Sequence, residues 1–180
     1  MTSLSDTQFA AAARRELLED ILPFWRTRTL DEQQGGFIGQ MSNDLHVYAK
    51  AYKGLILNAR ILWTFCAVYR YTQDEQDQAL AWRAYDYLTS RFLDPQYGGC
   101  FWELDARGGV IDDRKKIYGE AFCIYALAEY YDTFKTSGAL ELATDIFHRI
   151  EERARDKEYG GYFEVMSRDC VLIQPETTLD

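Results

Sequence analysis

Five stretches of this chain carry apolar residues at every third or fourth position, with charged and polar residues between them. Apolar side chains at that spacing share one face of an α-helix, so each stretch is expected to form an amphipathic helix. The expected helices cover residues 9–28, 46–71, 76–92, 117–134 and 139–155. Asp6 or Thr7 is the expected cap of the first helix, and Ser137 that of the fifth.

A Gly-Gly-apolar-apolar element occurs three times, at residues 35–38, 98–101 and 160–163. The glycine pairs are 63 and 62 residues apart, and a near-constant period of this size indicates stacked supersecondary units. Polar turn residues precede each glycine pair, and a short apolar segment follows it. This arrangement predicts a brief β-hairpin at one end of the helices.

Antiparallel helix pairs that repeat about every 62 residues build either an open solenoid or a closed ring. A closed ring of six pairs needs roughly 370 residues, so five helices in 180 residues supply less than half of it. The predicted fold class is therefore all-α, an incomplete toroid of helix pairs with short Gly-Gly hairpins. No linker rich in Pro or Ser divides residues 1–180, which are expected to form a single domain with a loop at 170–180.

The composition favours a large core and an uncharged ligand. Hydrophobic residues make up 47% of the chain and aromatic residues 15%. The 20 basic and 29 acidic residues give a formal net charge of −9, which repels nucleic-acid phosphates and anionic lipid headgroups. We therefore expect no nucleic-acid or membrane partner, and a neutral sugar suits this charge better. No long apolar run and no signal peptide are visible, which predicts a cytoplasmic protein.

The four cysteines do not form a metal-binding or disulfide pattern. They are Cys66, Cys100, Cys123 and Cys170, and none of them belongs to a C-x-x-C pair. Three of them lie within apolar segments, so free and mostly buried thiols are expected.

Five short motifs occur in the order in which one enzyme family has them. They are KGLILNARILWTF at 53–65, RAYDYL at 83–88, YGGCFW at 97–102, YGEAFCIYAL at 118–127, and GGYFE at 160–164 followed by SRD at 167–169. Together they resemble the cellobiose 2-epimerases of the N-acylglucosamine 2-epimerase superfamily. The resemblance extends from about residue 22 to residue 169.

The resemblance implies an (α/α)6 barrel, of which this chain would be the N-terminal half, with inner helices that line a sugar pocket. It also implies inversion of C2 in the reducing-end glucose of β-1,4-linked disaccharides. Members of the family open the pyranose ring, remove the C2 proton to form an enediolate and return a proton to the opposite face. Two histidines act as acid and base, and neither cofactor nor metal is required. A proton next to a carbonyl is acidic enough for such a base if donors stabilise the enediolate.

Arg60 and Tyr118 are the strongest site candidates. Arg60 falls within an apolar stripe of its helix, where a guanidinium must either be paired or line a wet cavity. Taken with the resemblance, this position predicts a cation that stabilises the enediolate and binds substrate oxygens. Tyr118 opens the fourth helix and shares a face with Phe122 and Tyr125. The resemblance implies that the Tyr118 side chain contacts the sugar.

Other residues near these two are weaker candidates. Trp63 could stack on a sugar ring, as could Trp102, although core packing is the commoner role of such residues. Asn58 is a candidate substrate-binding residue, but it lies about 160° around the helix from Arg60, which favours bracing a neighbouring helix. A role for Lys53 near the face of Arg60 is left open.

Neither histidine falls where the resemblance implies the acid and base. His46 lies in a loop, and His148 lies on an amphipathic helix among charged residues, where a surface role is expected. The match weakens after residue 169, and Cys170 stands where the family commonly has Trp. The chain is therefore expected to hold one face of the pocket, to lack the catalytic histidines and to be inactive alone.

Three alternatives stay open at this stage. The protein could be related to N-acylglucosamine 2-epimerases or to mannose isomerases, although the LNARILWTF run favours the disaccharide branch. It could also be a non-catalytic helical-repeat module that binds a sugar or a protein. The open edge of an incomplete barrel would expose apolar surface, so self-association through that edge is expected.

Overall fold

The computed structural model describes residues 5–173, which form eight α-helical or π-helical segments and five short strands. The first helix is continuous, with a π-helical stretch inside it. The helical elements are α1 (Asp6–Arg15), η1 (Glu16–Ile21), α2 (Leu22–Arg28), α3 (Leu55–Thr72), α4 (Glu75–Tyr87), η2 (Leu88–Phe92), α5 (Ile117–Phe134) and α6 (Ser137–Arg153). The strands are β1 (Lys53–Gly54), β2 (Glu103–Leu104), β3 (Val110–Asp112), β4 (Lys115–Lys116) and β5 (Val165–Met166).

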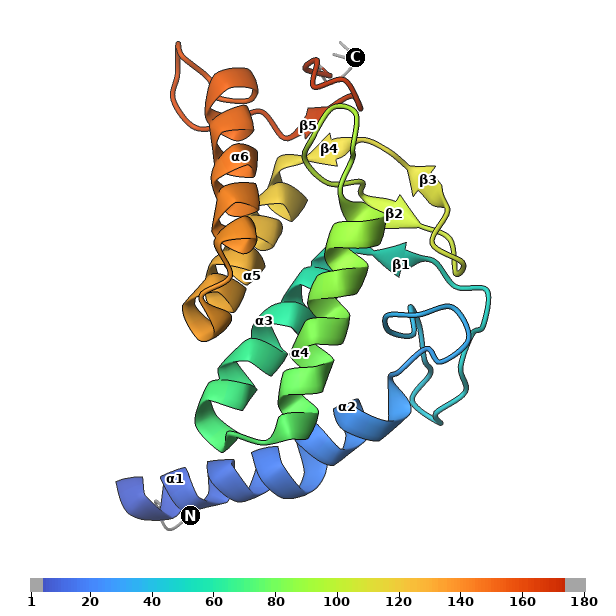
Figure 1. Cartoon of the computed structure of the whole chain (residues 1–180), viewed down its shortest axis with the longest axis vertical. Coiled ribbons are helices and arrows are strands. Elements are labelled where there is room, and N and C mark those ends of the chain that lie inside the picture. The colour runs from blue at the N-terminus through green and yellow to red at the C-terminus, as the bar shows by residue number, and fades with distance from the viewer. Residues whose placement is uncertain (1–4, 174–180) are drawn as a thin grey trace, which may run out of the picture.

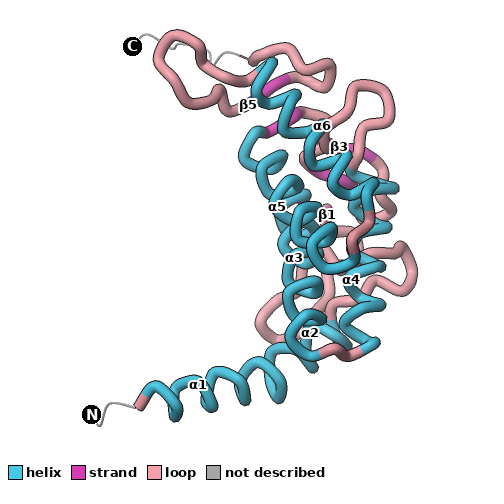
Figure 2. Tube along the Cα trace, turned by 60° about the vertical axis from the view of Figure 1, so that its left-hand side comes forward, coloured by secondary structure: helices cyan, strands magenta, loops and turns pink. Residues whose placement is uncertain are grey.

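The helices form two layers (Figure 1). The inner helices α3 and α5 pack side by side, and the outer helices α4 and α6 pack behind them. In Figure 2 the chain curves so that α3 and α5 line its concave side and α4 and α6 its convex side. The first helix crosses one end of the layers, where the Arg26 guanidinium donates to the fully buried Asp77 carboxylate of α4.

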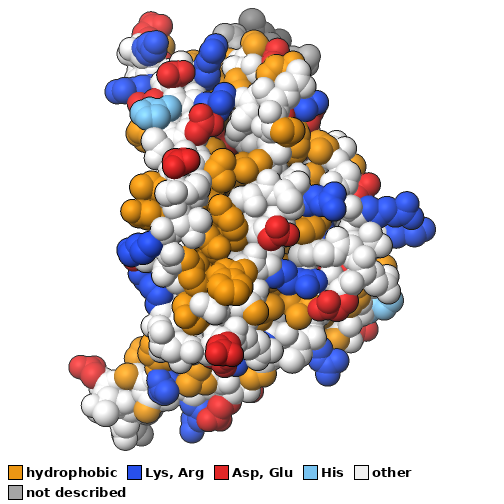
Figure 3. Space-filling view, in the orientation of Figure 1, with side chains coloured by type: hydrophobic (Ala, Val, Ile, Leu, Met, Phe, Trp, Pro, Cys, Tyr) orange, Lys and Arg blue, Asp and Glu red, His pale blue; other side chains and the backbone are white. Residues whose placement is uncertain are grey.

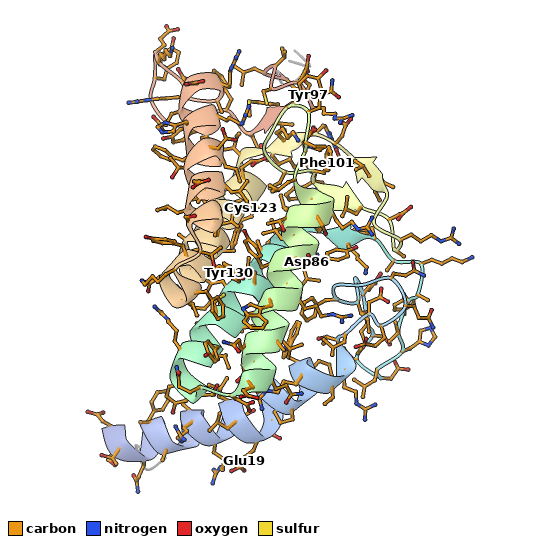
Figure 4. The ribbon with its side chains drawn as sticks, viewed as in Figure 1. Glu19, Asp86, Tyr97, Phe101, Cys123 and Tyr130 are labelled. Carbon is orange, nitrogen blue, oxygen red and sulfur yellow. The ribbon has the colours of Figure 1, made fainter. Side chains whose placement is uncertain are left out.

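The core lies between the two layers. Tyr85 of α4 and Tyr130 of α5 stack with ring centroids 4.0 Å apart, and Figure 4 shows Tyr130 in this space. Apolar side chains also gather on the outer surface over α4 and α6, as Figure 3 shows, where Trp82, Leu140 and Phe147 are exposed. The large side chains that are almost completely buried include Phe37, Leu55, Leu62, Phe65, Leu88, Phe92, Leu104, Leu127 and Ile146.

All three Gly-Gly elements fold into the same hairpin, which confirms the repeat. The hairpins close through the bridges Leu30–Phe37, Leu93–Cys100 and Arg155–Tyr162. Both glycines of each pair have φ between 64° and 79°, a left-handed conformation that side chains with a Cβ disfavour. The first residue of each turn is an aspartate, and its Oδ1 accepts two backbone N–H groups of the turn.

A buried lysine fastens each of the first two hairpins to the inner helix that follows it. Lys53 Nζ donates to Asp31 Oδ2 and to the Gly35 carbonyl, at 2.7 Å each, and Lys115 Nζ donates to Asp94 Oδ2 at 3.1 Å. Both lysine side chains are 1% exposed. Burial alone would raise the pKa of Asp94, but hydrogen bonds, including those from Arg168 and Lys115, hold it well below its ordinary value.

An arginine from the following outer helix also binds each of these two hairpins, and the lysine and arginine together are called the clasp of that hairpin. Arg83 of α4 donates to the carbonyls of Asp31 and Gly36, and Arg149 of α6 donates to the carbonyl of Tyr97. The lysine strands also pair in the same register, β1 with β2 and β4 with β5. Each of the first two hairpins is therefore held by residues of the helix pair that comes after it in the chain.

The five predicted helices are all present, but three details of the prediction were wrong. The second helix begins at Leu55 and not at 46, because residues 40–51 form a loop closed by a Met41–Val47 bridge and local hydrogen bonds. Ser5 caps the first helix, in a capping box with Gln8, in place of Asp6 or Thr7. Thr136 is the N-cap of α6, and Ser137 is its first helical residue.

The remaining structural expectations concern the cysteines, the C-terminal end and the membrane. Cys66, Cys100 and Cys123 are buried free thiols, and Cys170 is half-buried. The predicted loop at 170–180 lies mostly outside the described residues, which end at 173. Within the described part, every helix is too short or too polar to span a bilayer.

Replacing Lys53 with Met should destabilise the fold, because Asp31 would lose its cation in a largely buried setting. Breaking a buried ion pair by removing one partner costs about 3–5 kcal/mol. Lys50→Met is the matched control, since Lys50 is exposed. Urea unfolding followed by circular dichroism measures both variants, and a similar small shift in the two would contradict the structural role of Lys53.

Candidate functional site

The concave face of the inner helices carries an open hollow of about 680 Å³. Its lining comes from two helix faces, because on each helix the contributing residues are three or four positions apart. Helix α3 supplies Arg60, Trp63 and Thr64, and helix α5 supplies Tyr118, Ala121, Phe122 and Tyr125.

Four aromatic rings form the wall of this hollow. Trp63 and Tyr125 stack with centroids 5.1 Å apart and an interplanar angle of 13°. These two residues are 62 positions apart, so they occupy the same place in consecutive repeats. Phe122 meets the rings of Tyr118 and Tyr125 edge-on, at 5.0 Å and 6.3 Å. Tyr118 is 63% exposed, so its ring and hydroxyl are available to a ligand.

Arg60 lines both this hollow and a second, more apolar one of about 410 Å³. The side chain is exposed, and within residues 5–173 it takes part in no ion pair, whereas Arg70 on the same helix pairs with Glu129 and Asp132. Arg60 therefore lines a wet cavity, one of the two settings expected from its position. The second hollow lies against the first helix and is also lined by Leu17, Ile21, Leu22, Trp25, Ile56, Leu57, Ile61, Thr64 and Phe65.

The pKa of Tyr125 reflects this mixed environment. Partial burial raises it above the ordinary value, and the nearby Glu129 carboxylate raises it further. The Arg60 guanidinium acts in the opposite direction. A positive charge and a hydroxyl thus share one side of the hollow, where both can bind ligand oxygens.

The structure brings together three of the four predicted site residues, Arg60, Trp63 and Tyr118. Asn58 is not with them. Its side chain is buried, and its amide donates to the Gly54 carbonyl at the start of its own helix. Asn58 therefore braces α3 itself and does not line either hollow that contains Arg60.

The weaker candidates also lie elsewhere. Lys53 is the buried hairpin clasp described above, and Trp102 is half-buried beneath the Lys116 ammonium, 4.1 Å from its ring centroid. His46 and His148 are both exposed, in a loop and on α6, and neither lines the hollow.

Sequence reasoning missed Thr64 and Ala121 as lining residues, and it assigned no role to Tyr125. The helical spacing from Arg60 and Tyr118 could have found all three, since they lie three, four or seven positions further on. It also missed Glu120, which occupies in α5 the place that Asn58 occupies in α3, one 62-residue repeat earlier.

Glu120 points away from the hollow and into the protein. It is 2% exposed, and its Oε1 accepts the Cys100 backbone N–H of the second hairpin at 2.7 Å. Its other oxygen is buried and has no hydrogen-bond partner among the described residues. Burial raises the pKa of Glu120 to about 7, against the opposing effects of the Cys100 hydrogen bond and of two nearby cations.

Comparison with known families and proteins gives a consistent result. Residues 36–176 match the model of the N-acylglucosamine 2-epimerase family. The chain is 42% identical to the cellobiose 2-epimerase of Eubacterium cellulosolvens over 86% of its own length and 38% of the relative's. It is 26% identical to the N-acylglucosamine 2-epimerase of Mus musculus, over 75% of the chain and 34% of that protein.

Solved structures agree with the fold. The cellobiose 2-epimerase of Bacillus thermoamylovorans B4167 superposes with a TM-score of 0.88 and 38% identity, covering 92% of this chain and 42% of that one. The chain thus spans about two fifths of the length of the relatives it matches. The curved double layer of helices is part of an (α/α)6 barrel.

Glu120→Gln should flatten the dependence of stability on pH. The pKa of Glu120 in the folded protein is about 7, above the ordinary value of 4.5. The contribution of Glu120 to the free energy of unfolding is therefore greatest below pH 4.5 and is lost as the pH rises through 7. A shift of this size corresponds to about 3 kcal/mol between the two ends of that range. Gln keeps an oxygen to accept the Cys100 N–H but does not ionise.

The measurement is the free energy of unfolding in urea at pH 5, 6, 7 and 8. Glu141→Gln is the matched control, because Glu141 is exposed on α6 and its replacement should leave the pH slope unchanged. The same slope in wild type and Glu120→Gln would show that the buried carboxyl does not titrate in this range.

Proposed function

This chain belongs to the N-acylglucosamine 2-epimerase family, and we propose that it supplies one face of the active site of a cellobiose 2-epimerase-like enzyme. The proposed substrate is a β-1,4-linked disaccharide, and the proposed reaction exchanges glucose and mannose at its reducing end. The observation that carries the proposal is the exposed Arg60 guanidinium in a hollow walled by Trp63, Tyr118 and Tyr125.

The wall suits a sugar because it offers both apolar ring faces and polar groups. A pyranose presents C–H bonds on its faces and hydroxyls at its rim. The stacked pair of Trp63 and Tyr125 provides a flat apolar surface for a C–H face, and the Tyr118 hydroxyl can donate to or accept from a rim hydroxyl. The hollow is open, which leaves room for a second sugar unit.

In the proposed reaction the ring opens to give an aldehyde at C1, and a base removes the proton from C2. The electron pair of that C–H bond forms the C1–C2 double bond, and negative charge develops on the oxygens of the enediolate. Reprotonation of C2 from the opposite face gives the epimer. Arg60 would donate to the enediolate oxygens, where a fixed cation stabilises the charge that develops in the transition state.

The acid and base are proposed to be histidines outside this chain. Neither His46 nor His148 lines the hollow, so neither can reach C2 of a sugar bound there. Epimerisation removes one proton and returns one, with no net oxidation or reduction. The proposed mechanism therefore includes no cofactor and no metal.

Sequence identity supports the disaccharide branch over the alternatives. The chain is 42% identical to a cellobiose 2-epimerase and 26% identical to an N-acylglucosamine 2-epimerase. A sugar-binding module without catalysis would use the same aromatic wall, and the two possibilities differ in whether Arg60 affects turnover or binding alone.

The chain by itself should not convert cellobiose. If the acid and base lie outside it, then incubation with cellobiose should yield no glucosyl-mannose product above the rate of the buffer. The reaction mixture is analysed by anion-exchange chromatography with pulsed amperometric detection. Any protein-dependent turnover would mean that proton-transfer groups exist within these 180 residues.

Arg60→Ala should lower turnover strongly in a completed barrel. In a chimera, the part of the Bacillus thermoamylovorans enzyme that this chain does not cover completes the ring. There the substitution should reduce kcat/KM about 10²–10³-fold, because one preorganised donor to the oxyanion is lost. Arg70→Ala, on the same helix but paired at the surface, should change kcat/KM less than threefold. Near-normal turnover by Arg60→Ala, with an unchanged circular dichroism spectrum, would remove Arg60 from the site.

A further inference from the structure

A second cation lies at the rim of the hollow, the edge at which α3 and α5 begin. Lys115 and Lys116 are neighbours on β4, so their side chains point to opposite faces of that strand. Lys115 points into the second hairpin, with its Nζ 4.5 Å from the Phe101 ring centroid. Lys116 points the other way, with its Nζ 4.1 Å from the Trp102 ring centroid. It is the residue just before α5, whose second residue, Tyr118, lines the hollow.

The Trp102 ring holds this cation beside the aromatic wall. A Cβ added at Gly119 would lie 3.0 Å from the Trp102 ring and 2.9 Å from the Leu55 side chain. The ring therefore packs against the first turn of α5 and the first residue of α3. Tyr118 is the neighbour of Gly119 in that turn, so the ammonium lies next to the exposed end of the wall.

The Lys116 ammonium has N–H groups available to a ligand. Among the described residues it takes part in no ion pair, whereas its neighbour Lys115 is buried and paired. Asp112 lies within reach of the Lys116 charge, but two nitrogens of the Arg114 guanidinium already donate to its carboxylate. The Trp102 ring contacts one side of the ammonium, and the N–H groups on its other side can donate to hydroxyls.

The matching place above α3 is open. Gly54 lies 62 positions before Lys116, and Figure 1 shows β1 and β4 leading into α3 and α5 at the same end of the layers. Its φ of −89° and ψ of 145° suit any residue, so the backbone does not require glycine there. A Cβ at Gly54 would meet no described atom within 4 Å. Gly54 pairs with Glu103, which follows Trp102, so this open space adjoins the cation.

The proposed reaction determines which end of a disaccharide comes to the rim. The reacting C1 and C2 lie beside Arg60, the sixth residue of α3, about 7.5 Å below the start of the helix. Deeper along the helices, the stacked rings of Trp63 and Tyr125 join α3 to α5. Beyond them Arg70 pairs with Glu129 at 2.8 Å. O4 carries the second sugar and lies across the pyranose from C1, so it points toward the open rim.

We propose that Lys116 gives the site its preference for a disaccharide by donating to hydroxyls of the second sugar, in the space that Gly54 leaves open. This assignment rests on the proposed epimerase function. Lys116 touches the second sugar and not the reacting carbons, so its contacts are absent when a single glucose binds. Arg60 and the aromatic wall meet the reacting sugar in both ligands.

The test compares the binding of cellobiose and glucose to the 180-residue chain, followed by NMR through the tryptophan indole N–H signals. Cellobiose should bind about tenfold more tightly than glucose, the effect of one charge-assisted hydrogen bond. Lys116→Met should weaken cellobiose binding about tenfold and leave glucose binding unchanged. Lys116→Arg keeps the charge and the donors and should retain most of the preference for cellobiose.

Two further variants separate this contact from general effects. Lys135→Met is the matched control, because Lys135 lies at the other end of α5 and pairs with Asp132, and it should alter neither affinity. Gly54→Leu fills the open space and should weaken the binding of cellobiose but not of glucose. Circular dichroism should show an unchanged helix content in each variant.

The outcomes distinguish the rim from the site below it. Equal affinity of the wild-type chain for the two sugars would overturn the assignment of Lys116, and so would an equal loss for both sugars in Lys116→Met. Either result leaves a sugar bound in the hollow and the proposed reaction untouched. Binding of neither sugar would count against the proposed function itself, and the assignment of Lys116 would fall with it.

Discussion

The buried ion pair between a hairpin aspartate and the lysine before the next inner helix is the interaction on which the rest of this structure depends. A lysine with 1% exposure is tolerated only when its charge is paired and hydrogen-bonded. The pairs Asp31–Lys53 and Asp94–Lys115 therefore fix where each hairpin lies relative to the helix that follows it. The positions of the glycine pairs, the short strands and the helix starts are linked through this contact.

The site inherits its geometry from these helix starts. Helices α3 and α5 begin two residues after their lysines, at Leu55 and Ile117, so equivalent positions of the two helices lie side by side. Trp63 and Tyr125 are such a pair, and their stacked rings form the centre of the aromatic wall. A shift of one residue in either helix start would rotate its face by about 100° and separate the two rings.

The two repeats share the hairpin ion pair, but they differ in the side chains that face the hollow and at one buried position. The place of Arg60 in α3 is taken by Phe122 in α5, so one repeat supplies the cation and the next supplies an apolar ring. The buried place of Asn58 is taken by Glu120, and the two make different hydrogen bonds. The Asn58 amide donates to a carbonyl of its own helix, and the Glu120 carboxyl accepts from the second hairpin.

The sequence by itself determined the helices, the repeat and the family, because hydrophobic period, paired glycines and ordered motifs are local signals. It also placed Arg60, Trp63 and Tyr118 on the faces where the structure brings them together. Only the tertiary structure decided that the second helix starts at Leu55, that Lys53 is a buried clasp and that Glu120 turns away from the hollow. Burial and ion pairing depend on residues 20 or more positions away, such as Asp31 for Lys53 and Cys100 for Glu120, and helical spacing within one segment carries no information about such partners.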